Sequence, residues 1–134
     1  MKILPIRTKS KNYNIYIGQN IISKINKIVI NENIKFKKTL IVVDKKIPKN
    51  FLKKILSKIV CDKKIIFLFN ASEKNKNLKS ANAILELLLK NNFTRNDIVI
   101  CLGGGITGDV TGFVASIYKR GLKFINIPTT LLSQ

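Results

Sequence analysis

The pattern of hydrophobic and polar residues changes part-way along the chain. Near the N-terminus, hydrophobic residues alternate with polar ones over Ile3–Arg7 and again over Tyr13–Ile17. This alternation predicts two β-strands joined by a turn at Lys9–Asn12. A helix is predicted to follow over Ile21–Ile30, because isoleucines recur there about one turn apart.

From residue 40 onward, short and wholly hydrophobic runs alternate with amphipathic segments. The hydrophobic runs predict four buried strands, at Leu40–Val43, Ile65–Phe69, Ile98–Leu102 and Phe124–Ile127. The segments between them predict helices: one begins at Pro48, one places Leu78, Ala81, Leu85 and Leu88 inward, one covers Val110–Tyr118, and another starts in Leu131–Gln134. The predicted fold is α/β: a Rossmann-like parallel sheet with helices on both faces, preceded by an N-terminal β-hairpin.

In such a sheet, ligands bind beyond the carboxyl ends of the strands. The segment Gly103–Gly108 follows one predicted strand and has the form G-x-G-x-x-G. Glycines allow the backbone to turn sharply and to approach a phosphate with its N–H groups, near the positive end of a helix dipole. The segment therefore predicts phosphate binding, and a strand-to-helix turn without a ligand is the alternative. No Gly-Lys-Ser/Thr follows, so it is not a Walker A motif.

The predicted helix that follows the glycine segment has two further features. Gly108, Gly112 and Ser116 recur every four residues, which predicts a flat face that packs closely on the sheet. Asp109 is predicted in the first helical turn. It would either stabilise the helix dipole or accept hydrogen bonds from a ribose or a nicotinamide.

The formal net charge is +18, from 25 Lys and Arg residues against 7 Asp and Glu residues. Nearly all of this charge is lysine, scattered among asparagine and isoleucine residues, which also have AT-rich codons. Only Arg7, Arg95 and Arg120 supply the guanidinium groups that favour phosphate backbones. Codon bias therefore accounts for the charge and no nucleic-acid partner is expected. A basic nucleic-acid-binding domain remains an alternative.

The remaining composition limits the chemistry. The chain has no histidine, so neither a histidine-ligated metal nor a hydrolytic triad is expected in it. Cys61 and Cys101 form no metal-spaced pair. No apolar run is long enough for a signal peptide or a membrane span, so a soluble cytoplasmic protein without a membrane partner is expected.

The last 32 residues carry a specific resemblance. The glycine segment is followed by Gly-Phe-Val-Ala-Ser, Tyr-Lys-Arg-Gly and Ile-Pro-Thr-Thr-Leu-Leu-Ser-Gln, ending at Gln134. This block resembles the signature of the 3-dehydroquinate synthases. The glycine segment and Pro-Thr-Thr also occur in the related glycerol and iron-dependent alcohol dehydrogenases, which are the alternative. The resemblance implies that residues 1–134 are an N-terminal NAD-binding domain, truncated at its C-terminal end and lacking the metal-binding helical domain.

The resemblance also implies which residues contact the cofactor. They are Asp44, Glu73, Lys76, Gly104, Gly105, Ile106, Thr107, Gly108, Asp109, Thr129 and Thr130. Without the resemblance, Asp44 would be a turn residue and the two threonines would be helix caps. Ala71 and Ser72 stand where the family usually has Asp and Gly. Arg120 matches an arginine that reaches the substrate phosphate in the neighbouring subunit.

The family converts 3-deoxy-D-arabino-heptulosonate 7-phosphate into 3-dehydroquinate and phosphate in the shikimate pathway. NAD is regenerated within each turnover, so the enzyme is a carbon–oxygen lyase. A zinc or cobalt ion acts as a Lewis acid, held by one Glu and two His of the C-terminal domain. The resemblance therefore implies that this chain contains no catalytic residue and no metal ligand and is inactive alone. The complete enzyme is expected to be a homodimer.

Overall fold

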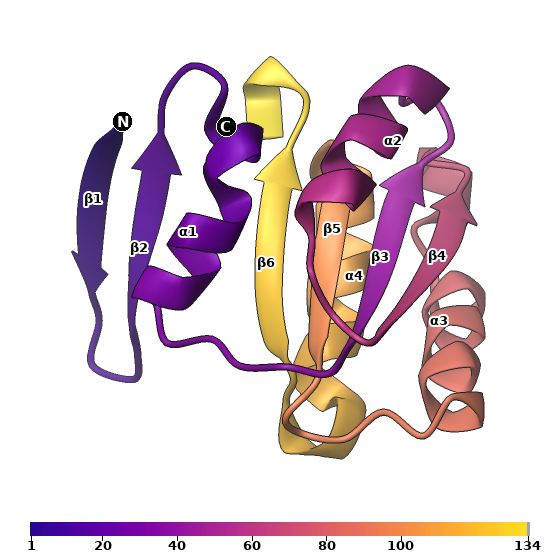
Figure 1. The fold of residues 1–134 in the computed structure, drawn as a ribbon. Helices are drawn as coiled ribbons and strands as arrows, with labels where there is room; N and C mark the ends of the chain where they lie inside the picture. The colour runs from indigo at the N-terminus through magenta and orange to yellow at the C-terminus, as the bar shows by residue number, and fades with distance from the viewer. Residues whose placement is uncertain (134) are drawn as a thin grey trace. The chain divides into compact units, whose positions relative to one another are not determined.

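The alternating segments at the N-terminus form the predicted hairpin. In the computed structural model, which describes residues 1–133, β1 (Lys2–Arg7) pairs antiparallel with β2 (Asn12–Ile17) (Figure 1). The N–H group of Thr8 donates to the carbonyl of Lys11 at 3.2 Å and closes the turn. The turn therefore begins one residue before the predicted one.

The hairpin belongs to the first of two compact units, formed by Met1–Ile34 and Lys53–Val60. The helix predicted after the hairpin is present, but its first turn, Ile21–Lys24, is a 3-10 turn that leads into α1 (Ile25–Asn31). The isoleucine spacing thus located the helix without distinguishing its two parts.

Glu32 joins the hairpin to the end of α1. Its Oε1 atom accepts hydrogen bonds from the hydroxyl of Tyr16 and, at 2.7 Å, from Nδ2 of Asn14. The hydrogen bond from Tyr16 lowers the pKa of Glu32, because it stabilises the carboxylate. The same bond raises the pKa of Tyr16.

The second unit contains a four-stranded sheet and is formed by Lys35–Leu52 and Cys61–Gln134, of which Gln134 lies outside the described residues. Its strands are all parallel, in the order β4-β3-β5-β6. They are β3 (Lys38–Asp44), β4 (Lys63–Phe69), β5 (Ile98–Gly103) and β6 (Lys123–Pro128). The predicted fold class, a parallel α/β sheet after a hairpin, is confirmed.

Only the two central strands of this sheet are buried on both faces. β3 and β5 have almost every side chain buried, whereas β4 and β6 alternate between exposed and half-buried positions. In β4, Ile66 is 42% and Leu68 is 54% exposed. The prediction of four fully buried strands was wrong for β4 and β6, because an edge strand has a neighbour on one side only and its hydrophobic run does not reveal this.

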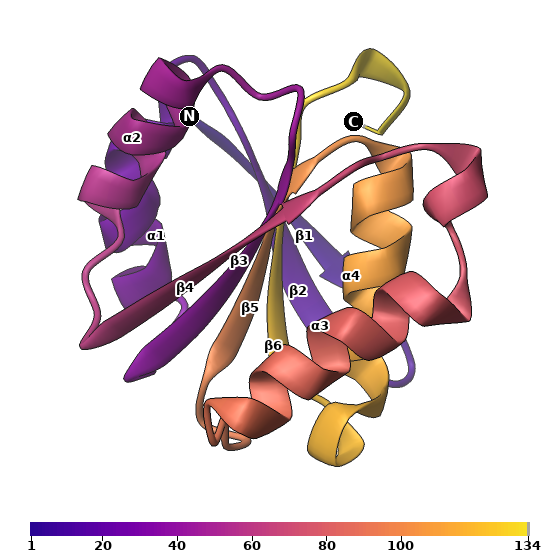
Figure 2. The same ribbon diagram turned by 90° about the vertical axis from the view of Figure 1, so that its right-hand side faces the viewer.

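Helices connect the strands. α2 (Lys49–Lys58) follows β3, α3 (Leu78–Lys90) follows β4, and α4 (Gly105–Ile117) follows β5. α3 and α4 cover the same face of the sheet (Figure 2). Their core side chains include Ala81, Ile84, Leu88, Val110, Val114 and Ala115, packed with Leu40, Val42 and Val99 of the sheet.

The N-terminus of α3 departs from the prediction. Leu78, predicted to point inward, is 69% exposed, and Ile84 is fully buried instead. Leu78 is the first residue of the helix, next to the cap Asn77, whose side chain accepts a hydrogen bond from the N–H group of Ser80 at 2.9 Å. The inward face of α3 therefore begins at Ala81.

α4 begins five residues earlier than predicted, at Gly105 instead of Val110. The flat face predicted from the glycine spacing is present at two of its three positions. A Cβ atom on Gly108 would lie 3.6 Å from Oδ1 of Asn126, and one on Gly112 would lie 3.4 Å from the ring of Phe124. Ser116 is exposed and donates to a carbonyl of its own helix, so it does not contact the sheet.

Candidate functional site

Most of the predicted site residues lie at one edge of the sheet in the second unit. Strands β3 to β6 end there, followed in turn by Asp44, by Glu73 and Lys76, by Gly104–Asp109, and by Thr129 and Thr130. Because the strands are parallel, their carboxyl ends share this edge, which is where open α/β sheets bind ligands. The chain thus brings eleven of the twelve predicted residues to one side of the sheet.

Direct contacts join the segments at this carboxyl edge. The N–H group of Lys45 donates to the carbonyl of Phe69 at 2.9 Å, which links the ends of β3 and β4. The N–H group of Thr129 donates to the carbonyl of Gly103 at 3.0 Å and links the ends of β5 and β6. Each of these bonds therefore holds the ends of two neighbouring strands together.

An ion pair joins the loop after β4 to α4. Nζ of Lys76 lies 2.7 Å from Oδ2 of Asp109, and this hydrogen bond raises the pKa of Lys76. Both side chains are exposed, so solvent screens the pair and its contribution to stability is small. Asp109 lies one turn into α4, beyond the first turn where it was predicted, because the helix begins at Gly105.

The three consecutive glycines have different roles. A Cβ atom on Gly103 would lie 2.7 Å from Cβ of Thr107, and one on Gly104 would lie 2.9 Å from Cγ2 of Thr130, so packing excludes a side chain at both positions. A Cβ atom on Gly105 would meet nothing within 4 Å. Gly105 is exposed and leaves its backbone open to an approaching ligand.

The N-terminus of α4 offers backbone donors beside this open space. The N–H group of Gly108 makes a helical hydrogen bond to the carbonyl of Gly104 at 2.9 Å. The N–H groups of Gly105, Ile106 and Thr107 precede it and have no helical acceptor. The N-cap residue is Gly104, which has no side chain that could accept a hydrogen bond from them. Free N–H groups at the start of a 13-residue helix suit a phosphate oxygen.

The side chain of Thr107 points away from this surface. It is fully buried against Gly103, and its Oγ1 atom has no hydrogen-bond partner among the described residues. Its carbonyl accepts from Oγ1 of Thr111 at 2.6 Å. Thr107 can therefore reach a ligand through its backbone N–H group and not through its hydroxyl.

Two other residues of the carboxyl edge make hydrogen bonds within their own turns. Oδ1 of Asp44 accepts a hydrogen bond from the N–H group of Lys46 at 2.9 Å. Oγ1 of Thr130 lies 2.7 Å from Oγ of Ser133, in the 3-10 turn Leu131–Ser133. Asp44 is half-buried and Thr130 exposed, so each still presents oxygen atoms to the surface.

The altered loop after β4 keeps an unstrained backbone. Ser72, which stands where the family usually has glycine, has an extended conformation with φ −149° that any residue adopts. Glu73 begins the 3-10 turn Glu73–Asn75, and Nδ2 of Asn75 donates to the carbonyl of Asn70 at 2.8 Å. The loss of glycine therefore costs this loop no conformational strain.

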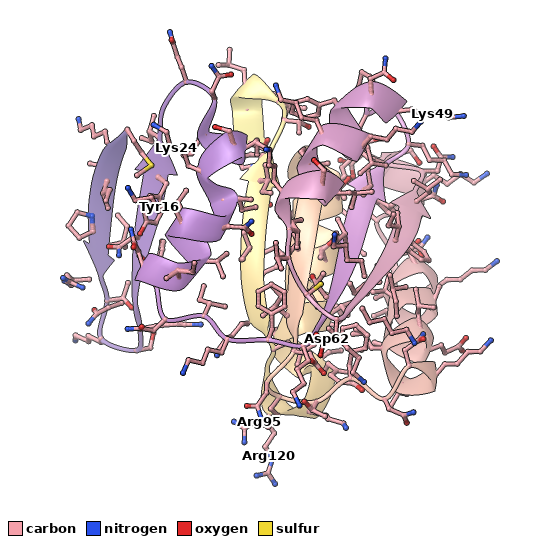
Figure 3. All side chains as sticks on the ribbon, in the orientation of Figure 1. Tyr16, Lys24, Lys49, Asp62, Arg95 and Arg120 are labelled. Atoms are coloured by element: carbon pink, nitrogen blue, oxygen red, sulfur yellow. The ribbon has the colours of Figure 1, made fainter. Side chains whose placement is uncertain are left out.

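Arg120 is the predicted residue that the chain does not bring to this edge. It lies in the turn that precedes β6, at the amino ends of the strands, and Figure 3 shows its side chain beyond those ends. β6 has 6 residues at about 3.3 Å each, so roughly 20 Å of strand separate Arg120 from Thr129.

Sequence reasoning missed a buried carboxylate at the amino ends. Asp97 is almost fully buried, and its oxygens accept hydrogen bonds from the N–H groups of Lys38 at 3.0 Å and Thr94 at 2.8 Å. The available signal was a threonine three residues before an aspartate that directly precedes a strand. This carboxylate fixes the start of β3 to the turn before β5.

The described residues contain no group of three or more His, Cys, Asp or Glu side chains that could hold a metal ion. Cys101 is buried in β5, and burial raises the pKa of its thiol to about 11. Over the same residues, every helix is too short or too polar to cross a membrane.

Comparison with known proteins identifies the family. A family model described as 3-dehydroquinate synthase N-terminal matches residues 66–134. The chain belongs to the 3-dehydroquinate synthase family. It is 56% identical to a 3-dehydroquinate synthase of Pelagibacter ubique over 131 residues, which are 98% of this chain and 36% of that protein. It is 42% identical to a 3-dehydroquinate synthase of Campylobacter concisus over 132 residues, 98% of this chain and 35% of that protein. The chain thus spans about a third of the length of these synthases.

Solved structures share the fold. A 2-deoxy-scyllo-inosose synthase complexed with carbaglucose-6-phosphate, NAD+ and Co2+ matches with a TM-score of 0.88 at 21% identity, over 98% of this chain and 36% of that one. A 2-epi-5-epi-valiolone synthase from Streptomyces hygroscopicus subsp. jinggangensis, with NAD+ and Zn2+ bound, matches with a TM-score of 0.73 at 20% identity, over 95% of this chain and 35% of that one. The chain thus shares its fold with about a third of each of these two proteins.

Proposed function

We propose that this chain is the NAD-binding part of a 3-dehydroquinate synthase that converts 3-deoxy-D-arabino-heptulosonate 7-phosphate into 3-dehydroquinate and phosphate. Family membership and the 56% identity to a protein of that name support the reaction. The observation that carries the proposal is the open space at Gly105, beside three N–H groups that have no helical acceptor. This is the shape that a dinucleotide pyrophosphate requires.

Different residues of the carboxyl edge would contact different parts of the cofactor. The N–H groups of Gly105, Ile106 and Thr107 donate to pyrophosphate oxygens, and Asp44 accepts hydrogen bonds from ribose hydroxyls. The remaining proposed contacts are Glu73, Lys76, Gly104, Gly108, Asp109, Thr129 and Thr130. NAD, when bound, supplies reversible hydride transfer. Relatives of similar fold were solved with NAD+ bound, which supports this choice of cofactor.

A divalent metal would be held by residues outside this chain. The chain has no histidine, and its described residues offer no metal-binding group. The two synthases of similar fold contain Co2+ or Zn2+. We therefore assign zinc or cobalt to the complete enzyme, and we expect residues 1–134 alone to release no phosphate from the heptulosonate. Phosphate release by residues 1–134 alone would contradict this assignment.

A glycine substitution tests the cofactor site. In the complete protein, Gly105→Ala places a methyl group in the open space that the pyrophosphate would occupy. We expect the Kd for NAD, measured by calorimetry, to rise at least tenfold while the melting temperature does not fall. Gly112→Ala is the matched control, since it makes the same substitution two turns along the same helix. Equal NAD affinity in the two variants would refute the site.

The reaction is tested separately from the cofactor. The complete protein should release phosphate from the heptulosonate 7-phosphate in an NAD-dependent manner and without net NADH. Net NADH formation from a simple polyol, with no phosphate release, would instead support the alcohol dehydrogenase alternative.

A further inference from the structure

The ion pair between Lys76 and Asp109 gives the aspartate a role that neither of its sequence-based interpretations includes. Nζ of Lys76 lies 2.7 Å from Oδ2 of Asp109. A carboxylate stabilises the helix dipole from within the first turn, and Asp109 lies beyond that turn because α4 begins at Gly105. What the carboxylate does in the free chain is hold the ammonium group of a loop that follows a different strand.

Asp109 lies on the same face of α4 as Gly105. Residues four apart in an α-helix lie one above the other, about 6 Å apart along the axis, and their side chains lean towards the N-terminus of the helix. Both residues are exposed, and a Cβ atom on Gly105 would meet nothing within 4 Å. The carboxylate of Asp109 therefore holds the ammonium group of Lys76 close to the free N–H groups at the start of α4.

The loop that carries Lys76 is folded by its own hydrogen bonds. The N–H group of Lys76 donates to the carbonyl of Glu73 at 3.2 Å. Nδ2 of Asn77, the cap of α3, donates to the carbonyl of Lys74 at 2.8 Å. The backbone of Lys76 is thus fixed on both sides, whereas its long side chain loses entropy when it is ordered. The hydrogen bond to Asp109 provides that ordering.

The surroundings of Lys76 keep it charged and leave it able to bind a second anion. The hydrogen bond to Asp109 raises the pKa of Lys76, and the nearby charge of Glu73 raises it further. An ammonium group has three donors, of which Asp109 receives one. The side chain of Lys76 is 44% exposed, so an arriving anion can reach the other donors.

We propose that Lys76 and Asp109 act as one unit in cofactor binding, in which Lys76 donates to a pyrophosphate oxygen and Asp109 is the positioning residue that holds its ammonium group beside the N-terminus of α4. This inference rests on the proposed function and makes the contribution of Asp109 indirect. A cation strengthens an anion site built from backbone N–H groups, because charge-assisted hydrogen bonds are stronger than neutral ones.

A double-mutant cycle on NAD binding by the complete protein tests whether the two residues act together. Lys76→Met and Asp109→Asn each remove a charge and keep the size of the side chain. We expect each to raise the Kd for NAD, measured by calorimetry, by about fivefold, and the double variant to raise it no further. Effects that multiply in the double variant, or single variants with an unchanged Kd, would overturn the proposal. Lys74→Met is the control, since it removes a neighbouring charge of the same loop and should change the Kd less than about twofold.

Exchanging the two charges separates positioning from direct contact. Lys76→Asp alone places two carboxylates opposite each other, so NAD should bind more weakly than to Lys76→Met. Adding Asp109→Lys restores an ion pair whose cation now lies on α4, and the Kd should fall below that of Lys76→Met. If Asp109 itself accepts hydrogen bonds from the cofactor, the exchange removes that acceptor and restores nothing. That result would contradict the positioning role.

Salt dependence tests whether the partner of Lys76 is a phosphate. The Kd for ADP should rise with KCl concentration less steeply in Lys76→Met than in the wild type, because one charged contact to phosphate has been removed. Equal slopes would place Lys76 away from the phosphates and refute its role.

Two remaining results separate this proposal from others. The free energy of unfolding should hardly change in the single variants, because both side chains are exposed; a large loss would assign the pair to the fold instead. If the wild type binds no NAD, the proposed function fails. The same double-mutant cycle with ADP then still decides whether the unit binds a diphosphate.

Discussion

The two edges of one sheet use their polar groups in opposite ways. At the amino edge, Asp97 and Tyr118 are buried, and both are hydrogen-bonded to backbone groups of neighbouring segments. At the carboxyl edge, Asp44 accepts a hydrogen bond from the N–H group of Lys46 in its own turn, and Gly105 faces open space. The first arrangement stabilises the fold, whereas the second leaves groups available to a ligand.

The largest expected effect sets the two aspartates against each other. Asp97→Ala removes the acceptor of two backbone hydrogen bonds to a buried charge and should lower the free energy of unfolding by about 3 kcal/mol. Asp44→Ala should lower it by less than about 1 kcal/mol, because its one bond stays within a turn. Urea denaturation of the two variants and the wild type measures both losses. Equal losses would remove the distinction between the edges.

Cys101 lies in β5, between the two edges, and the pH dependence of stability tests how strongly its thiol is buried. Burial raises the pKa of its thiol from 9.0 to about 11, so its contribution to stability is full below pH 9 and is lost as pH rises towards 11. The free energy of unfolding of the wild type should fall by roughly 2–3 kcal/mol more than that of Cys101→Ala between these pH values. The lysines titrate in both proteins and cancel. Parallel pH profiles would show that the thiol is not shielded.

A third prediction separates packing from binding within the carboxyl edge itself. Gly103→Ala forces a methyl group to within 2.7 Å of the buried Thr107, so we expect a loss of about 2 kcal/mol. Gly105→Ala, two residues away, should leave stability unchanged or raise it by less than about 1 kcal/mol. Chemical denaturation of both variants gives the comparison. A destabilised Gly105→Ala would mean that this glycine, too, is structural.

The smallest effect concerns the link between the two turns of the amino edge. Tyr118→Phe removes the hydrogen bond to the carbonyl of Phe93 and should cost about 1 kcal/mol. Urea denaturation measures this loss, and an unchanged free energy of unfolding would show that the hydrogen bond adds nothing to stability.

The sequence predicted the fold where hydrophobic patterns are local. The hairpin, the four strands and the position of the glycine segment after β5 are all observed. Strand order does not depend on local sequence. The hydrophobic run of the edge strand β4, which includes Ile66 and Leu68, resembles the runs of the central strands β3 and β5. The exposure of that strand was therefore not predictable from its hydrophobic run.

The candidate site shows a similar limit. The glycine spacing located the N-terminus of α4, but it could not tell that Gly103 and Gly104 are required by packing while Gly105 is open. That distinction depends on Thr107 and on Thr130, which follows the next strand and is 26 residues from Gly104 in sequence. Asp97 was missed for the same reason, since one of its partners is Lys38 of a strand far away in the sequence.

The open glycine at the start of α4 has a consequence for protein engineering and evolution. Alanine is the better helix former, so a selection for thermal tolerance alone would tend to replace Gly105. The same selection would retain Gly103, which packing already protects. Gly105 would then persist only under selection for activity. Under the proposed cofactor role of Gly105, sequences that have lost this glycine while keeping Gly103 and Gly104 would mark family members that retain the fold without binding NAD.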